Sequence, residues 1–338
     1  MTLAIPETHE EAIAPAWLSA ALGVDVVRVD AGAIDQRVST NQPVQVHLAD
    51  GSTKDLWIKG YFSEMGRAFR SAGVPEAMFY RDLAADSGLR TLRVAYAGAD
   101  LTTEANVVVT EDVVGEGATF LDALHPYTVE QAAASLEQLA TLHARTWMAP
   151  ALADVPWLAP RLEAYTVARG VKDIAQNFDG PNGAGVPEAV KDAQRLYDTY
   201  TSVAAAAVGT EPWCVIHGDS HIGNLYLDAE QRPCFLDWQL VQRGPWFLDV
   251  GYHLASVLTV ADRRAHEDEL LRHYLAAVEG HGVDAPSIDA VRPLLVRGFV
   301  HGFYLWAITL RVDPRIIAAL VQRLGTAVDD HGGYAVCI

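Results

Sequence analysis

A short polar segment in the second half of the chain carries the residues best suited to chemistry. It reads His217-Gly-Asp219-Ser-His221-Ile-Gly-Asn224, and Asp237-Trp-Gln follows thirteen residues after the asparagine. Phosphoryl transfer to an alcohol needs a carboxylate that orients the hydroxyl, oxygen ligands for magnesium and a cation on the phosphates. Asp219 can supply the first. Asn224 and Asp237 can supply the second, because hard oxygen ligands suit Mg²⁺.

The same segment leaves a second interpretation open. His217, Asp219 and His221 alternate along the chain, and imidazoles and carboxylates at such a spacing can bind zinc, as in a metal-dependent hydrolase. The sequence offers no obvious second cluster of ligands to complete that site. The spacing of Asn224 and Asp237 would also be left unexplained, so phosphoryl transfer accounts for more of the pattern.

The elements before this segment are predicted to form a small antiparallel sheet. Residues 24–29 and 44–48 alternate between apolar and polar, Asp50-Gly51 is a hairpin turn signal, and residues 56–59 resume a strand. Further strands are expected at 92–97 and 107–110. Helices are expected at 14–22 and, after Pro75, at 76–84.

After Asp112 the pattern changes from strands to helices. Thr128 and Gln131 form a capping-box pattern ahead of an amphipathic helix, and residues 150–210 look helical with a loop at 177–185. Short strands at 214–216 and 234–236 bracket the polar segment, and helices resume from about residue 247. We therefore expect an α+β fold with an N-terminal lobe over 1–112 and a helical C-terminal lobe over 113–338.

The pattern HGDxxxxN followed by DWQ resembles the catalytic and metal motifs of the aminoglycoside phosphotransferase and choline kinase superfamily. The resemblance implies a protein-kinase-like two-lobed fold, ATP and Mg²⁺ as cofactors, and a small-molecule alcohol as acceptor. It implies that Asp219 is the catalytic base and that Asn224 and Asp237 hold magnesium. The sequence around Asp237 and Tyr252 most resembles the ecdysteroid-kinase-like, or CHK-type, branch.

The resemblance extends to other parts of the chain. Lys59, at the end of a predicted strand, resembles the phosphate-binding lysine, and Glu76 on the following helix resembles the glutamate that pairs with it. Residues 107–113 resemble the hinge that binds adenine through its backbone, which implicates Glu111 and Val113. By the same resemblance His217 and Asp249 support the catalytic loop.

One part departs from the family pattern. The phosphate-covering loop should lie near residues 32–44, which contain a single glycine and carry Ser39 and Thr40 at the expected tip. Hydroxyl and backbone donors can replace the close approach that glycine allows. This departure leaves open the choice between ATP and GTP. It also leaves open a catalytically silent module that binds nucleotide without turnover.

Aromatic residues near the motifs suggest where an acceptor would bind. Trp238, Tyr252 and Tyr304 are candidates for an acceptor pocket, although Trp238 could instead pack beneath it. The aromatic residues of the final helices recur at helical spacing, which favours a role in the core. An aminoglycoside or choline would be drawn by an acidic surface, whereas a sterol-like alcohol would suit the aromatic residues at 299–306.

Composition limits the classes of partner. Twenty-five basic and 43 acidic side chains give a formal charge of −18, which repels nucleic acids and anionic membranes. Cys214, Cys234 and Cys337 are too few and too scattered for a disulfide framework. We find no basic start followed by an apolar run and no apolar stretch long enough to span a bilayer. A cytoplasmic protein without a membrane span is expected.

Overall fold

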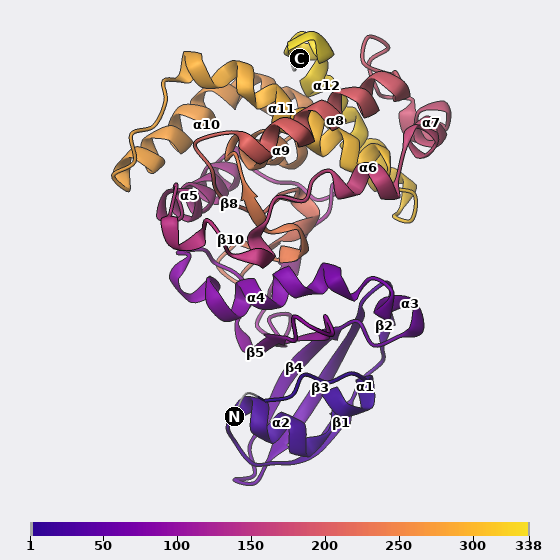
Figure 1. Cartoon of the computed structure of the whole chain (residues 1–338), viewed down its shortest axis with the longest axis vertical. Helices are drawn as coiled ribbons and strands as arrows, with labels where there is room; N and C mark the ends of the chain where they lie inside the picture. Colours follow the sequence, from indigo (N-terminus) through magenta and orange to yellow (C-terminus); the bar gives the residue numbers. More distant parts are fainter. Residues whose placement is uncertain (1–2, 337–338) are drawn as a thin grey trace. The chain divides into compact units, whose positions relative to one another are not determined.

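The computed structural model describes residues 3–336 and divides the chain into two compact units (Figure 1). The first unit contains the residues up to Thr119 together with Leu236–Val241. The second contains Phe120–Phe235 and the residues from Gln242 onwards. The expected lobe ranges of 1–112 and 113–338 stay predictions. The observed first unit is discontinuous, because it also includes the segment 236–241.

An antiparallel sheet forms the centre of the first unit. Its strands follow the spatial order β1-β3-β4-β6-β5, with β2 paired to β3. Their bounds are β1 Val26–Ala31, β2 Asp35–Gln36, β3 Thr40–Leu48, β4 Thr53–Gly60, β5 Val94–Ala99 and β6 Asn106–Glu111. The predicted turn between β3 and β4 is present, and Gly51 adopts φ +86° there, a conformation that glycine tolerates well. The predicted antiparallel sheet is therefore confirmed.

The two faces of this sheet have different roles. Helices α1 (His9–Ala12) and α2 (Pro15–Leu22) bury Ala12 and Leu18 against one face, where Leu56 and Ile58 of β4 also lie (Figure 1). Because successive side chains of a strand point to opposite faces, Lys59 faces away from this core. Helix α4 (Val74–Asp82) packs against β5 and β6 and supplies the partner of Lys59.

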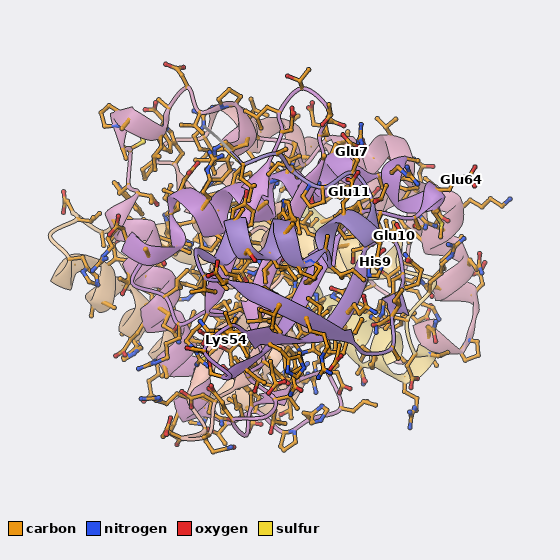
Figure 2. The ribbon with its side chains drawn as sticks, turned by 90° about the horizontal axis from the view of Figure 1, so that it is seen from below. Glu7, His9, Glu10, Glu11, Lys54 and Glu64 are labelled. Atoms are coloured by element: carbon orange, nitrogen blue, oxygen red, sulfur yellow. The ribbon has the colours of Figure 1, made fainter. Side chains whose placement is uncertain are left out.

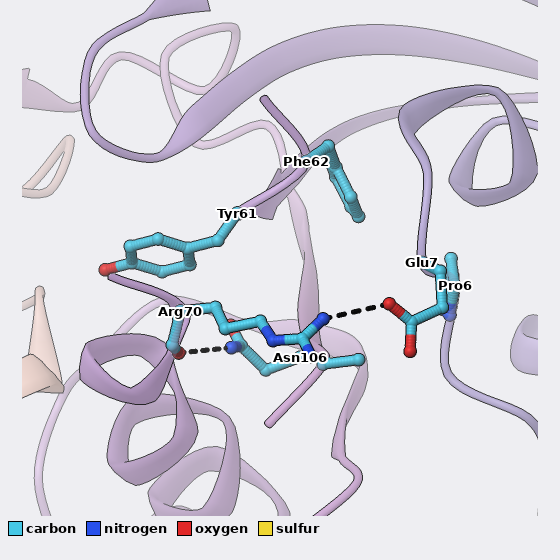
Figure 3. A pocket seen from close by; sticks show the side chains of 7 residues that line it. Pro6, Glu7, Tyr61, Phe62, Arg70 and Asn106 are labelled. Carbon is cyan, nitrogen blue, oxygen red and sulfur yellow. Dashed lines mark hydrogen bonds and ion pairs between the residues drawn. The ribbon is translucent and has the colours of Figure 1, made fainter. Parts of the chain in front are cut away.

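The chain leading into α4 is fastened on both sides. It consists of α3 (Glu64–Arg67) and the 3₁₀ turn η1 (Arg70–Gly73), neither of which was expected from the sequence. Arg70 Nη1 lies 2.9 Å from Glu7 Oε2, and Arg70 O accepts a 2.8 Å hydrogen bond from Asn106 Nδ2 (Figure 3). The cavity beside these groups has a volume of about 10 Å³, which leaves room for one water at most.

Several acidic side chains surround the first helix. Glu7, Glu10 and Glu11 lie near one another, with Glu64 on the neighbouring α3 (Figure 2). Glu11 forms a capping box with Thr8, so part of this charge has a structural use.

The second unit is largely helical. Its helices are α5 (Val129–Arg145), α6 (Ala164–Ala168), α7 (Val171–Asp179), α8 (Ala193–Gly209), α9 (Phe247–Val257), α10 (Val260–Gly280), α11 (Ile288–Ala307) and α12 (Pro314–Asp330). The capping box predicted for α5 is present at Thr128 and Gln131. Helix α9 packs against α11 and α5, and α11 packs against α12 (Figure 1).

The loop predicted at 177–185 is wrong at its start, because α7 continues to Asp179. Tertiary contacts extend the helix beyond its sequence signal. Asn177 is buried and its Nδ2 donates to the carbonyl oxygens of Ala307 and Thr309, each at 2.8 Å.

Short strands frame the polar segment of the second unit. β8 (Cys214–Ile216) pairs with β11 (Gln242–Gly244), and β9 (Leu225–Leu227) pairs with β10 (Pro233–Phe235) and β7 (Thr119–Phe120). Residues 217–224 connect β8 to β9 and end in the 3₁₀ turn η6 (Ile222–Asn224). The predicted strands at 214–216 and 234–236 are thus present as β8 and, one residue earlier, β10. Within the described part of the chain, no helix has both the length and the apolarity to cross a membrane.

The remaining short turns complete the description. They are η2 (Ala84–Asp86), η3 (Pro150–Leu152), η4 (Pro156–Leu158), η5 (Pro181–Gly183), η7 (Trp238–Leu240) and η8 (Gly333–Val336). Of these, η7 belongs to the first unit and packs against α4.

Candidate active site

Three candidate residues meet in the first unit. Lys59 Nζ lies 2.7 Å from Glu76 Oε2 and 3.1 Å from Asp237 Oδ1. Lys59 comes from β4, Glu76 from the first turn of α4, and Asp237 from the segment just before η7. From the sequence we expect Glu76 to pair with Lys59, and the structure contains that pair. Asp237 contacts the same ammonium as a second carboxylate.

The charges of this cluster depend on one another. Burial disfavours a charge on Lys59, but Asp237 and Glu76 outweigh it and raise the pKa of the ammonium above its ordinary value. Burial raises the pKa of Glu76, and the neighbouring Lys59 works against that rise. The ammonium therefore stays protonated, with its direction fixed by two carboxylates. A lysine held in this way can act as a point charge on phosphate oxygens.

Trp238 holds the backbone next to Asp237. Asp237 adopts φ 61° and ψ 68°, a left-handed conformation that is uncommon for residues other than glycine. The Trp238 N–H donates to the Glu76 carboxylate, and its indole stacks on Phe79 with ring centroids 3.8 Å apart. Its Nε1 donates to Thr91 Oγ1 at 3.2 Å. Because Trp238 is fully buried, the structure places it in the packing of the first unit.

The second unit holds Asp219 in the loop after β8. Its Oδ1 accepts a 3.1 Å hydrogen bond from the Tyr252 hydroxyl, and its Oδ2 accepts one of 3.1 Å from Asn224 Nδ2. Burial alone would raise the pKa of Asp219, but His221, His217 and Tyr252 outweigh burial and lower the pKa to about 2. Asp219 is consequently an ionised carboxylate at neutral pH, the form that can accept a proton from an alcohol.

Asp249 supports the backbone of this loop. Its Oδ2 accepts a 2.6 Å hydrogen bond from the His217 N–H, and its Oδ1 accepts one of 2.8 Å from the Gly218 N–H. His143 Nε2 lies 3.2 Å from the same carboxylate. The His217 ring in turn accepts the Asp219 N–H through Nδ1 at 3.2 Å. His217 and Asp249 are thus hydrogen-bonded to the backbone of this loop, and their support of a catalytic loop stays a prediction.

Asn224 is oriented in a way that suits a metal ligand. Its Nδ2 donates both to Asp219 O, at 2.7 Å, and to the Asp219 carboxylate, so its Oδ1 is the side-chain atom that could coordinate a metal ion. An amide oxygen such as this one is a hard ligand of the kind that Mg²⁺ accepts, and the Asp237 carboxylate of the first unit is of the same kind. Their contact with a metal ion stays a prediction.

The geometry gives no support to the zinc alternative. The Nδ1 atoms of His217 and His221 accept the N–H groups of Asp219 and Gly223. Over residues 3–336, no three His, Cys, Asp or Glu side chains converge as a metal site.

The candidate acceptor residues are less accessible than expected. Tyr252 is fully buried and presents its hydroxyl to Asp219. Tyr304 is also fully buried, donates to the carbonyl oxygens of Tyr165 and Arg169, and stacks on Tyr200 at 3.8 Å. The aromatic residues of the final helices therefore belong to the core, as their spacing favoured.

The candidate phosphate-loop and hinge residues lie in the first unit, where their side chains bind neighbouring protein groups. Thr40 Oγ1 donates to Gln36 Oε1, and Ser39 Oγ accepts from Asn41 Nδ2. Glu111, at the end of β6, forms an ion pair with Arg93. Val113 is buried in the turn that follows. Their contact with a nucleotide stays a prediction.

Two residues near Asp219 were missed by the sequence interpretation. His253 and His301 donate hydrogen bonds to the carbonyl oxygens of Ser220 and Gly218. His253 lies four residues after Asp249, close to the motif. His301 lies in an apolar helix, and no pattern near it signals this contact.

Comparison with known proteins agrees with this architecture. A 228-residue stretch, 64% of the chain, is 25% identical to an uncharacterized kinase-like protein of Caenorhabditis elegans, of which the match spans 59%. The fold is similar to that of an ethanolamine kinase of Plasmodium vivax, with TM-score 0.51 and 12% identity over 92% of this chain and 86% of that one. It is also similar to LicA, a choline kinase of Streptococcus pneumoniae, in complex with AMP. That comparison gives TM-score 0.50 and 15% identity over 96% of this chain and all of LicA.

A sequence profile of the phosphotransferase enzyme family matches residues 62–286. This range covers more than half of the chain and contains Glu76, Asp219, Asn224 and Asp237. The chain belongs to the phosphotransferase enzyme family.

Proposed function

We propose that this protein transfers the γ-phosphoryl group of ATP to a hydroxyl of a small molecule, with magnesium as cofactor. The observation that carries the proposal is the cluster of Lys59, Glu76 and Asp237, in which two carboxylates direct one partly buried ammonium. Family membership supports phosphoryl transfer as the reaction class, and the similar fold of LicA binds a nucleotide, AMP.

In this proposal the first unit binds the phosphates. Lys59 contacts α- and β-phosphate oxygens, and Glu76 keeps the ammonium from turning away. Asp237 and Asn224 Oδ1 would hold Mg²⁺, whose charge offsets that of the phosphates during transfer. Glu111 and Val113 would contact the adenine through their backbone, and Ser39 and Thr40 would lie near the phosphates.

Asp219 acts on the acceptor. Its ionised carboxylate orients the hydroxyl and accepts its proton as the oxygen attacks the γ-phosphorus and the bond to the β-phosphate oxygen breaks, which releases ADP. Tyr252 and Asn224 hold the carboxylate on both oxygens. Much of the rate enhancement would come from this positioning.

The acceptor is proposed at the level of a small alcohol. Choline and ethanolamine kinases share the fold, and the acidic composition of this chain would attract a cationic alcohol such as an aminoglycoside. An apolar, sterol-like alcohol is the competing class. The buried state of Tyr304 removes one of the aromatic residues at 299–306 that had favoured it.

An acceptor screen tests the function. The purified protein is incubated with ATP, Mg²⁺ and a panel of amino alcohols, aminoglycosides, sugars and sterols, and ADP release is measured with and without each acceptor. We expect acceptor-dependent ADP release and a phosphorylated product detectable by mass spectrometry. Failure to bind ATP with Mg²⁺ would refute the proposal. Binding without transfer to any acceptor would favour the silent nucleotide-binding module.

A further inference from the structure

Asp219 is flanked in sequence by two carbonyl groups that each contact a buried histidine. His301 in α11 places Nε2 2.7 Å from Gly218 O, and His253 in α9 places Nδ1 2.8 Å from Ser220 O. Both imidazoles are fully buried and reach the loop from different helices. The sequence motif around Asp219 contains neither of them.

These contacts define the tautomer of each ring. A carbonyl oxygen can only accept, so the histidine nitrogen facing it must carry the proton. His253 then donates through Nδ1, and its Nε2 accepts from Ser135 Oγ at 2.6 Å. His301 donates through Nε2, and its Nδ1 has no hydrogen-bond partner within the described residues. Burial lowers the pKa of both rings, for His253 to about 4, which keeps them neutral.

The backbone on both sides of Asp219 is thereby held by several hydrogen bonds. Asp249 and the His217 ring bind the N–H groups of residues 217–219, as described above. The carbonyl of Asp219 accepts from Asn224 Nδ2, and the two histidines bind the carbonyls before and after it. Gly218 adopts φ +78°, so the peptide that precedes Asp219 depends on outside contacts for its direction.

We propose that His301 and His253 are positioning residues that aim the Asp219 carboxylate by holding the peptides on either side of it. The proposal rests on the role of Asp219 in the proposed function. Loss of either donor leaves a buried carbonyl without a partner and frees the adjacent peptide to rotate. Because misplacement of a reacting group by about 1 Å can reduce a rate on the order of 10²-fold, kcat should fall. The KM for ATP should change little, since Lys59 and Glu76 belong to the other unit.

The two donors sit at different places on their rings, which permits a reciprocal test. Glutamine carries its amide nitrogen near the position of Nε2, whereas asparagine carries it near that of Nδ1. At position 301 the donor is Nε2, so His301→Gln should lose less kcat than His301→Asn. At position 253 the donor is Nδ1, so His253→Asn should lose less kcat than His253→Gln. A role in filling space would favour glutamine at both positions.

The experiment measures kcat and the KM for ATP for these four variants, and hydrogen–deuterium exchange of peptides that cover residues 217–224. His281→Gln and His281→Asn serve as controls, because His281 is exposed in the same unit and contacts Thr141 away from the loop. We expect the order of kcat to reverse between positions 301 and 253, with faster exchange of the loop in His301→Asn and His253→Gln.

The same order at both positions, or unchanged kcat and exchange in those two variants, would overturn the proposal. A wild-type protein that transfers no phosphate would refute the proposed function alone. The exchange pattern of the four variants would still decide whether the two histidines hold the loop.

Discussion

The ammonium of Lys59 lies 2.7 Å from a Glu76 carboxylate that is 4% exposed, so β4 and α4 of the first unit are joined by an ion pair whose carboxylate is buried. Asp237 contacts the same ammonium, which couples the pair to a proposed magnesium ligand. Such a pair contributes little to stability compared with a well-packed apolar contact, but breaking it leaves a charge buried without its partner. Its value to the molecule is the fixed direction of the ammonium.

Replacement of Glu76 with alanine should weaken nucleotide binding and destabilise the fold. Loss of one partner of a buried ion pair costs about 3–5 kcal/mol, and the released ammonium would contact Asp237 alone. Calorimetric titration with ADP and Mg²⁺ should show an affinity reduced at least about tenfold, since each 1.4 kcal/mol is a factor of ten. Glu64→Ala, on the exposed α3 of the same unit, is the control. Equal affinity of Glu76→Ala and wild type would exclude the proposed role of the pair.

Replacement of Asp219 with asparagine should abolish transfer while nucleotide binding persists. Asparagine keeps the shape and can still accept the Tyr252 hydrogen bond, but it cannot take the proton of the acceptor. Turnover by Asp219→Asn, measured as acceptor-dependent ADP release, should fall at least about 10²-fold. Affinity for ATP with Mg²⁺ is measured on the same sample as the internal control. Full turnover by this variant would remove Asp219 from its proposed role.

Replacement of Trp238 should affect magnesium use more than acceptor use. Trp238→Ala removes the ring that stacks on Phe79 and should cost about 3–5 kcal/mol of stability. It also frees the backbone next to Asp237, so half-maximal transfer should require more Mg²⁺. Trp238→Phe keeps the stack on Phe79 but loses the hydrogen bond to Thr91. Its magnesium requirement should therefore lie between those of the wild type and Trp238→Ala. A rise in the acceptor KM at unchanged magnesium dependence would instead indicate that Trp238 contacts the acceptor.

The free energy of unfolding should fall as the pH drops from about 6.5 to about 4. Burial, aided by His217 and His221 and opposed by Asp249, lowers the pKa of His253 to about 4. In the unfolded chain His253 has an ordinary pKa of about 6.5, so as the pH falls the unfolded state binds a proton before the folded state does. The contribution of the neutral, buried His253 to the free energy of unfolding is therefore complete above about pH 6.5. It is lost as the pH falls through the folded pKa. The difference amounts to about 3 kcal/mol for this residue.

Urea unfolding at pH 7 and pH 4.5 measures this effect. The variant His253→Asn has no group that titrates there, so its free energy of unfolding should change less between the two pH values than that of the wild type. An identical pH dependence in both proteins would contradict the prediction.

Asp237→Asn should raise the magnesium requirement for transfer. The amide keeps one oxygen ligand but loses the charge that attracts the cation. Chelation of Mg²⁺ should stop transfer by the wild type, and added Mg²⁺ should restore it. Initial rates over a magnesium titration give the half-saturating concentrations of both proteins. Asp228→Asn, which alters a carboxylate bound to Arg232 in a turn of the second unit, is the matched control.

Local sequence patterns predicted much of the fold and the closeness of Asp219 to Asn224 within the site. Alternation in β4 separates Ile58 from Lys59, and the short spacing of Asp219 and Asn224 lets one tight loop bring them together. β8 and β10, which precede and follow the polar segment, are short apolar runs flanked by polar residues, a pattern typical of strands. The pairing of Lys59 with Glu76 could be expected only from the family resemblance.

Other features depend on contacts far apart in the sequence. His301 lies 83 residues from Gly218, in a helix that is apolar on most sides, so its bond to the loop has no local signature. The stack of Trp238 on Phe79 decides between core and pocket for Trp238, which the sequence left open. Helix α3 has only four residues, too few for a helical period to be visible.

The return of Leu236–Val241 to the first unit has a consequence for how the protein is made. When synthesis has reached Thr119, the nascent chain contains Lys59 and Glu76. It does not yet contain Asp237, the second carboxylate, or Trp238, whose ring stacks on Phe79. The first unit therefore cannot be completed until synthesis has passed Val241, and until then Phe79 lacks the ring that stacks on it. A fragment cut at Thr119 would remain in that unfinished state and is a poor choice for isolated expression.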